Sequence, residues 1–384
     1  MSGFGVEHLP YGAILPLGGW TAADAAAAGV AEHLAGRPVL STRLGADAVL
    51  LPLLAAGGLL GDDPDLQAAL LATTLNPLIE LGPPAWRELR TRLQEVLPEG
   101  ADRVRARVPL GRCAHVLPVR VPDYADFFAS VEHVENFGRI FRPGQPAVRE
   151  SWYHLPVAYH GRGSTLIASN TPVRRPRGML GPGRFGPTEA LDVECEVAFV
   201  CGPGAAGPIA VDDAGAHIFG VALLNDWSAR DIQRFETVPL GPFLGKSFAT
   251  GLSAWITPLA ALADARVPPR PQDPQPAEYL RASAPWALDL ALEIEVDGEV
   301  VARPNASTLY WTPAQMLAHM TVNGATLSTG DVFATGTVSA PEPGSLAELW
   351  EGERWLADGE EVVLRGRAGP VELGEVRGQV VAAG

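Results

Sequence analysis

The sequence predicts a mostly β protein with some helix, of the α+β class, in which residues 1–116 and residues 117–384 form two domains. A chain of 384 residues is long enough for two domains, or for one large domain with an appendage. Its 42 glycines and 35 prolines favour many turns. Apolar and polar side chains alternate with the two-residue period of strands in several stretches, and helical spacing is less common.

Composition and charge exclude several classes of partner and location. The net charge is −15, and the longest basic cluster is residues 174–177, so nucleic acid is not an expected partner. No uncharged apolar run reaches the roughly 20 residues of a membrane span. The three cysteines form no CxxC pair, and the first residues lack the features of a signal peptide. We therefore expect a cytoplasmic protein that does not bind a membrane.

The N-terminal part contains short apolar runs, at residues 11–17 and 48–54, and two helical patterns. One pattern starts at Asp63-Pro64, a suitable N-cap and first helical residue, and runs to about residue 81. The other starts at Pro83-Pro84. No catalytic cluster is evident here, and we expect three isolated histidines to be structural or solvated: His8, His33 and His115.

A helix is expected to start within residues 122–126. Asp126 and His133 are seven residues apart, which would place them near one face of that helix. Each also has a simpler interpretation, Asp126 as a helix-capping acid and His133 as a surface imidazole. Residues 151–177 mix aromatic residues with glycines and are expected to be mostly loop.

Residues 191–200 alternate strictly, so that Asp192, Glu194 and Glu196 point to one face of a strand. Adjacent acids repel one another and therefore need either bulk water or a cation. Water is the ordinary explanation for an outer strand face, but Asp126 and Asp226 could supply further oxygens. Carboxylates without cysteine or histidine suit a hard cation, so the sequence favours Ca²⁺ or Mg²⁺.

In the stretch 217–251, a predicted buried strand is followed directly by a segment of polar residues. The apolar run 218–224 predicts the strand, and a polar segment, residues 225–231, follows directly. Lys246, the only lysine in the chain, lies in a loop framed by glycine and proline. Because a lysine ammonium is a compact donor that arginine does not replace, we expect Lys246 to act in a site.

The last third of the chain has clear local signals. Residues 286–302 predict a hairpin with a two-residue turn at Asp297-Gly298. Residues 312–315 form a capping box that opens a helix to about residue 320. Residues 332–340 predict a strand.

Several motifs, in this order along the chain, together resemble the fumarylacetoacetate hydrolase family: DYADFFASVEHVENFGRIFR, WYHLPVAYHGR, LDVECEVAF, HIFGVALLNDWSARDIQRFE, PLGPFLGKSF and ATGTVS. The resemblance implies an N-terminal SH3-like barrel domain and a C-terminal domain with a mixed β-roll core. It also implies a homodimer that uses Ca²⁺ or Mg²⁺. The reaction implied is hydrolysis of a carbon–carbon bond in fumarylacetoacetate, a diketo acid, to fumarate and acetoacetate, in tyrosine and phenylalanine catabolism.

The same resemblance implies roles for individual residues. The expected catalytic residues are His133 as general base, Glu348 as its partner, and Arg230, Gln233 and Lys246 around the oxyanion. The expected metal ligands are Asp126, Glu194, Glu196 and Asp226, with Lys246 and Thr250 near a second cation site. The expected substrate-binding residues are Phe128, Arg142, Tyr159, Gln233, Thr237 and Thr337. His133 can accept the proton of the attacking water if the imidazole is neutral near pH 7.

Three positions depart from the family's usual residues. Phe128 and Thr237 stand where tyrosines are usual, and Ala249 stands in place of a glycine. The lost hydroxyls favour, as an alternative, a hydrolase of another acylpyruvate or β-diketo acid. Two other hypotheses are a cation-stabilised scaffold, and a decarboxylase or isomerase, neither of which would need the pairing of His133 with Glu348.

Overall fold

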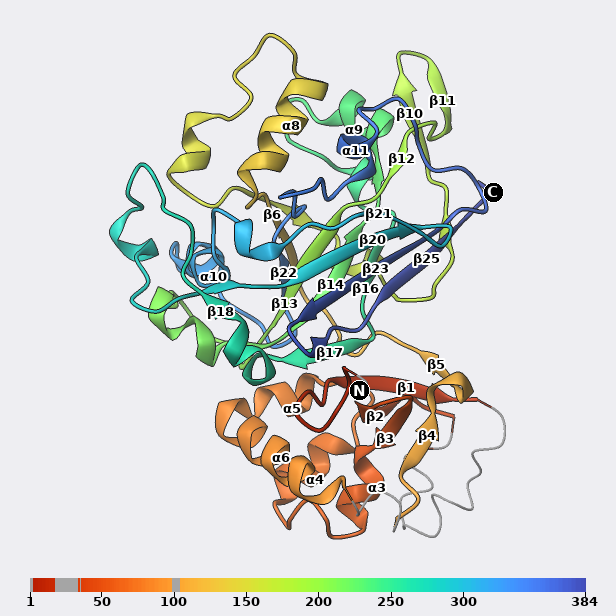
Figure 1. Ribbon diagram of the computed structural model, residues 1–384, viewed down its shortest axis with the longest axis vertical. Coiled ribbons are helices and arrows are strands. Elements are labelled where there is room, and N and C mark those ends of the chain that lie inside the picture. The colour runs from red at the N-terminus through yellow and green to blue at the C-terminus, as the bar shows by residue number, and fades with distance from the viewer. Residues whose placement is uncertain (1–2, 18–33, 35, 99–103) are drawn as a thin grey trace.

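The computed structural model describes residues 3–17, 34, 36–98 and 104–384, and His33 lies outside these ranges (Figure 1). The described elements are mostly strands with some helices, which confirms the predicted α+β class. None of the helices in these ranges is both long enough and apolar enough to cross a membrane.

The N-terminal part combines short strands with a group of helices at one end of the molecule (Figure 1). The strands are β1 (Tyr11–Pro16), β2 (Val39–Leu44), β3 (Asp47–Leu50), β4 (Arg107–Pro109) and β5 (Cys113–His115). The helices are α3 (Leu51–Ala56), α4 (Pro64–Leu70), α5 (Asn76–Glu80) and α6 (Gly82–Val96). The single helix predicted for residues 64–81 is therefore wrong: it is divided into α4 and α5. The break covers residues 71–75, and Pro77 stands in the first turn of α5, where its missing N–H is tolerated.

One large sheet continues from the N-terminal strands into the rest of the chain. Strand β1 pairs antiparallel with β17 (Trp255–Pro258), and β17 pairs with β14 (Ile218–Asp226). The apolar core beneath the N-terminal helices also includes side chains from the later part, among them Phe219 and Leu224. The two parts therefore share a core, and the domain division at residues 116 and 117 stays a prediction.

The centre of this sheet holds the strands that carry the predicted site. Beyond β14 the order is β13 (Cys195–Cys201), β22 (Val332–Ala334), β6 (Tyr124–Phe127) and β7 (Ala158–Gly161). Strand β16 (Thr250–Leu252) pairs with β14 and with β8 (Leu166–Ala168). Because β7 and β8 lie within residues 151–177, the prediction that this interval is mostly loop is wrong in part.

A second sheet covers one face of β13 and β14. Its described strands are β20 (Ala291–Val296), β21 (Glu299–Ala302), β23 (Glu361–Ala368), β24 (Val371–Glu372), β25 (Val376–Val381) and β9 (Val173–Arg174). Gly366 of β23 lies so close to Leu223 of β14 that an added Cβ atom would be 3.1 Å from that side chain. Every residue from 191 to 200 and from 218 to 226 is buried, so neither stretch has a face exposed to bulk water.

The turn and the capping box predicted in the last third of the chain are confirmed, whereas the strand predicted for residues 332–340 is wrong in part, because β22 covers only Val332–Ala334. Asp297 and Gly298 have φ values of 48° and 83°, which is the left-handed geometry of a tight turn between β20 and β21. Thr312 and Gln315 form both halves of the predicted capping box at the start of α10 (Pro313–Thr321). Small two-stranded sheets, β10–β11 (Arg177–Gly181, Arg184–Pro187), β12–β15 (Leu191–Asp192, Ser228–Ala229) and β18–β19 (Arg266–Val267, Ala287–Leu288), complete the described strands.

Candidate metal centre and catalytic site

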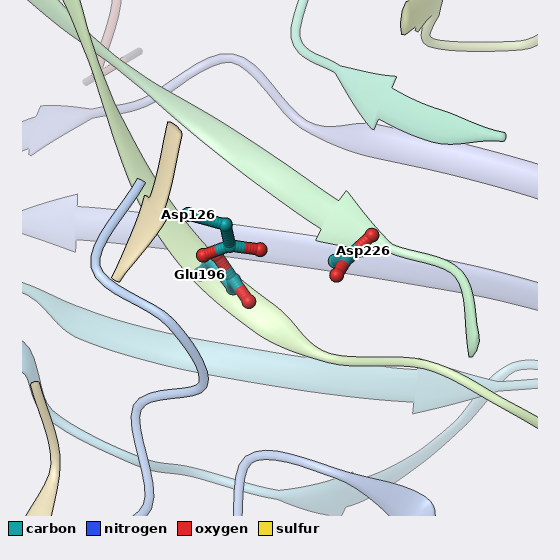
Figure 2. Close-up of side chains that lie close together, drawn as sticks. All are labelled: Asp126, Glu196 and Asp226. Atoms are coloured by element: carbon teal, nitrogen blue, oxygen red, sulfur yellow. The ribbon is translucent and has the colours of Figure 1, made fainter. Parts of the chain in front are cut away.

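Three carboxylates from three different strands meet in the interior (Figure 2). Asp126 comes from β6, Glu196 from β13 and Asp226 from the last position of β14. One oxygen from each lies within 4.8 Å of the others, and the three residues are at most 1% exposed. The alternative that the acids of strand 191–200 face water is therefore excluded.

Sheet register explains why these side chains converge. Strand β22 lies between β13 and β6, and its Ala334 is opposite both Ala198 and Asp126. A small residue at this central position leaves room for acids that approach from the strands on either side. Asp226 is opposite Thr250 of β16, and Thr250 Oγ1 lies 3.5 Å from Asp226 Oδ1.

Asp126 reaches the site from a strand, not from a helix. Tyr124–Phe127 is β6, and the helix that follows, α8 (Val131–Phe141), begins only after the N-cap residue Ser130. The prediction that a helix starts within residues 122–126 and carries Asp126 on one face with His133 is therefore wrong. The turn between β6 and α8 brings the two residues into the same region instead.

The three carboxylates lack protein partners that would neutralise them fully. Among the described residues, Asp126 Oδ1 and both oxygens of Glu196 are buried without a hydrogen-bond partner. Burial and the charge of Asp226 raise the pKa of Asp126 from 3.8 to about 8. Burial and the neighbouring Asp126 also raise the pKa of Glu196 well above its usual range. Oxygen ligands that are buried and unpaired fit a hard divalent cation, so this cluster could hold a metal ion.

Glu194, the fourth predicted ligand, has different neighbours. Its carboxylate accepts hydrogen bonds from Arg230, at 2.6 Å, and from Lys246. Burial by itself would raise the pKa of Glu194, but Arg230 and Lys246 hold it well below its usual range. Its role as a metal ligand stays a prediction.

Lys246 connects Glu194 to the group of three carboxylates. It lies in a short 3₁₀ turn, Leu244–Lys246, and Nζ donates to both Glu194 and Asp226. Burial of the ammonium opposes its charged form, yet Asp226 and Glu194 raise the pKa of Lys246 above its ordinary value. The only lysine of the chain is therefore buried, charged and inside the site.

His133 and Glu348 form a buried hydrogen-bonded pair. His133 Nδ1 lies 2.6 Å from Glu348 Oε2, and the other ring nitrogen, Nε2, lies 3.6 Å from Glu194 Oε1. Burial opposes protonation of His133, but Glu348 and Glu194 together raise its pKa from 6.5 to about 9. Helix α8 carries His133, and α11 (Leu346–Leu349) carries Glu348, so the pair joins segments 215 residues apart.

Glu348 has three further hydrogen-bond donors. Asn136 donates to Oε1 at 2.8 Å, whereas Ser339 and Ser345 donate to Oε2 at 2.9 and 2.8 Å. Burial would raise the pKa of Glu348, but His133 and these donors lower it overall. The carboxylate is therefore held ionised and in one orientation.

Arg230, at the start of α9 (Arg230–Glu236), is also buried and charged. Its Nη1 donates to Gln233 Oε1 at 3.0 Å, and its Nε donates to Asp192 Oδ2 at 2.8 Å. Burial opposes the charged form of Arg230, but Glu194 and Asp192 raise its pKa. Arg230 and Lys246 thus contact Glu194, and Gln233 contacts Arg230, whereas their role around an oxyanion stays a prediction.

The predicted substrate-binding residues are only partly brought together. The hydroxyl oxygen of Tyr159 on β7 lies 2.9 Å from Asp126 Oδ2 and 2.6 Å from Asp226 Oδ2, so the hydroxyl contacts both carboxylates and can donate its one proton to either. The ring of Phe128 meets His133 edge-on, with centroids 5.2 Å apart. Thr337 is 1% exposed, and within the described ranges its Oγ1 has no hydrogen-bond partner.

Two predicted substrate-binding residues use their polar groups elsewhere. Arg142, which follows α8, donates to the carbonyl of Ala147 at 2.9 Å. Thr237 Oγ1 donates to the carbonyl of Gln233 in its own helix. Neither forms a hydrogen bond or ion pair with another predicted site side chain in the parts of the chain that the structure describes.

Sequence reasoning missed several residues that support the site. Tyr124 donates to Asp126 at 2.9 Å, and Asp192 pairs with Arg230. The two-residue alternation had placed Asp192 on one face with Glu194 and Glu196, but no site role was predicted for it. Tyr124 also follows that rule, two residues before Asp126. The serines at 339 and 345 carried no comparable signal, since their partner Glu348 is fixed only by the fold.

A buried acidic cluster that could hold a metal ion, next to a His–Glu pair and the buried side chains of Arg230 and Lys246, fits the class of metal-dependent hydrolases. A family model described as fumarylacetoacetate (FAA) hydrolase C-terminal matches residues 124–381, and one described as fumarylacetoacetase N-terminal matches residues 28–118. The chain belongs to the fumarylacetoacetate hydrolase family.

Curated relatives and solved structures agree with this membership. The chain is 42% identical to the fumarylacetoacetase of Homo sapiens, covering 76% of this chain and 78% of that protein. It is 39% identical to that of Arabidopsis thaliana, covering 99% and 96%. A fumarylacetoacetate hydrolase structure from Exiguobacterium antarcticum has a TM-score of 0.58 at 16% identity, covering 97% of this chain and 99% of that one. A putative HpcE protein from Mycobacterium smegmatis has a TM-score of 0.57 at 21% identity, covering 90% and 97%. At these identities, the solved structures support the fold alone.

Proposed function

We propose that this protein is a hydrolase that cleaves the carbon–carbon bond of fumarylacetoacetate to give fumarate and acetoacetate. The observation that carries the proposal is the 2.6 Å contact between His133 Nδ1 and Glu348, next to a buried group of three carboxylates. Relatives named as fumarylacetoacetases, at about 40% identity over most of the chain, support the substrate.

His133 is the general base in this proposal. Glu348 accepts a hydrogen bond from Nδ1–H and stays ionised, which leaves Nε2 without a proton and able to take one from the attacking water. With protein groups alone the pKa of His133 is about 9, so the imidazole would be charged at neutral pH. A cation among the carboxylates would lower this pKa by charge repulsion and so favour the neutral base.

Asp126, Glu196 and Asp226 would hold the divalent cation, and Glu194 would join them as the family resemblance implies. When bound, such an ion supplies positive charge next to the oxygens of the diketone and of the enolate that departs. The unpaired oxygens of Asp126 and Glu196 support this assignment. The carboxylates do not discriminate Ca²⁺ from Mg²⁺ by donor type, so both remain candidates, and Thr250 beside Asp226 and Lys246 would border a second cation.

Arg230, Gln233 and Lys246 would stabilise the oxyanion that forms when water adds to the carbonyl. Arg230 and Lys246 supply charge, and the Gln233 side chain supplies an amide. As the carbon–carbon bond breaks, its electron pair leaves on the acetoacetate carbon as an enolate, which then takes a proton. Removal of one preorganised donor of this kind typically costs on the order of 10²–10³ in rate.

A hydrolase of another acylpyruvate or β-diketo acid is the second candidate. Phe128 offers no hydroxyl beside His133, and the Thr237 hydroxyl is used by its own helix. Both positions are usually tyrosine in the family, so the groups that would read the distal carboxylate differ here. Arg142, Tyr159 and Thr337 remain as proposed substrate contacts in either case.

The direct test is turnover of fumarylacetoacetate, followed by loss of the diketone absorbance, with Mg²⁺, with Ca²⁺ and with EDTA. His133→Ala should abolish turnover, whereas His160→Ala, at an exposed histidine of β7, should leave it within twofold. Comparison of kcat/KM across diketo acids of different chain length separates the candidates. A preference for a shorter acylpyruvate over fumarylacetoacetate would replace the first candidate by the second.

We further propose that the enzyme acts as a homodimer in the cytoplasm, in tyrosine and phenylalanine catabolism. Family resemblance motivates the dimer, and the cysteine pattern motivates the location. Light scattering of the purified protein tests the dimer: a mass of about one chain, 40.5 kDa, would contradict it.

A further inference from the structure

Asp192 is a fully buried acid to which neither the metal centre nor the proposed chemistry assigns a role. It ends β12, is 0% exposed, and is not part of the group of three carboxylates. We propose that Asp192 is a positioning residue that holds Arg230 and helix α11 in one fixed arrangement. This inference rests on the proposed function, because Arg230 stabilises the oxyanion there and Glu348 of α11 orients the base His133.

One oxygen of Asp192 fixes the guanidinium of Arg230. Oδ2 accepts from Arg230 Nε at 2.8 Å and lies 2.7 Å from Nη2. An arginine side chain has several rotatable bonds, so two contacts at one carboxylate oxygen remove much of its freedom. Phe137 adds a packing face, with the guanidinium carbon 4.6 Å from its ring centre.

The other oxygen of Asp192 fixes the start of α11. Oδ1 accepts from the backbone N–H of Ala347 at 3.1 Å, directly before Glu348 in the chain. The first N–H groups of a helix have no partner within the helix, and a helix of four residues is not stable by itself. The contact with Asp192 therefore helps to set where Glu348 stands.

Charge neutralisation alone does not account for this geometry. Arg230 already contacts Glu194, but Glu194 is also bound to Lys246 and lies 3.6 Å from His133 Nε2. If Glu194 turns toward a cation, Asp192 still holds Arg230. The two oxygens of one carboxylate thus join the oxyanion donors to the segment that orients the base.

The first test is Asp192→Asn, which keeps the shape and the acceptor for Ala347 but can present an amide N–H₂ to the guanidinium. We expect kcat for fumarylacetoacetate to fall about 100-fold while KM changes less than fivefold, because the oxyanion donors act in the transition state. Asp331→Asn is the matched control. Asp331 is 3% exposed and accepts backbone N–H groups of Asp123 and Ser328, outside the site. Its variant should keep kcat within twofold.

The second test is the double variant with Arg230→Gln. Independent losses multiply, whereas a residue that acts through Arg230 adds nothing once Arg230 is gone. We expect the double variant to be within threefold of Arg230→Gln alone. A loss equal to the product of the single losses, or an Asp192→Asn variant within threefold of the parent, would overturn the inference.

A readout independent of turnover is amide hydrogen exchange over residues 345–350. Asp192→Ser cannot reach both partners and should speed exchange there at least tenfold, and unchanged exchange would also overturn the inference. A parent protein that does not hydrolyse fumarylacetoacetate would refute the proposed function, and the exchange measurement would still decide whether Asp192 fixes α11.

Discussion

Replacing Glu348 by glutamine tests the central pair of the site. The pKa of His133 rises from 6.5 to about 9 in spite of burial, so its carboxylate neighbours stabilise the imidazolium. The rise from 6.5 to about 9 corresponds to about 3 kcal/mol in favour of the imidazolium, and the charge of Glu348, 2.6 Å away, is first among the groups that raise the pKa. In the Glu348→Gln variant the side chain carries no charge, and its NH₂ group can face Nδ1 in place of the oxygen that accepts the hydrogen bond.

We expect Glu348→Gln to lower kcat by about 10²–10⁴-fold, because the variant loses the charge that stabilises the imidazolium and can also fix the wrong tautomer of His133. KM should change little, because Glu348 contacts His133 and no group expected to bind substrate. The assay is the initial rate of loss of diketone absorbance at saturating fumarylacetoacetate with Mg²⁺.

Glu295→Gln is the control for this experiment. Glu295 pairs with Arg365 at 2.5 Å in the second sheet, so the same chemical change is made outside the site. Its kcat should stay within twofold of the parent. If Glu348→Gln retained more than a third of the parent's kcat while His133→Ala was inactive, the reasoning that Glu348 orients and charges the base would be refuted.

Three other predictions concern the cation site and the backbone beside it. Without divalent ions, the folded protein keeps a proton on Asp126 up to pH about 8 that the unfolded chain loses near 3.8, so the Tm should fall as pH rises between these values. Asp126→Asn should reduce that fall. If the variant and the parent, both in EDTA, showed the same slope of Tm against pH, the raised pKa of Asp126 would be contradicted. Lys246→Arg should lower kcat about 10²–10³-fold, because a planar guanidinium cannot replace an ammonium between Glu194 and Asp226; unchanged turnover would contradict it. Gly336→Ala should destabilise the fold by about 1–3 kcal/mol in urea titration, since φ is +71° and the new Cβ atom would be 2.1 Å from the carbonyl oxygen of Phe127; an unchanged midpoint would contradict it.

Local chemistry explains why much of the fold could be predicted. The strand at 218–224, the turn at Asp297-Gly298 and the capping box at 312–315 each depend on neighbours within a few residues, and all three are confirmed. The helix predicted to start within residues 122–126 failed because its apolar residues also fit a short buried strand. Periodicity does not separate the two in so short a segment.

The sequence by itself determined the fold class, the family and the set of chemical groups, because residue types and local spacing are written in the chain. The tertiary structure decided which groups meet. It placed three acids within 4.8 Å on separate strands, set Glu194 between two cations, and joined His133 to a carboxylate 215 residues away. It also gave Asp192 its two partners. Such contacts depend on strand register and on how the sheets pack, and these depend on residues far apart in the chain.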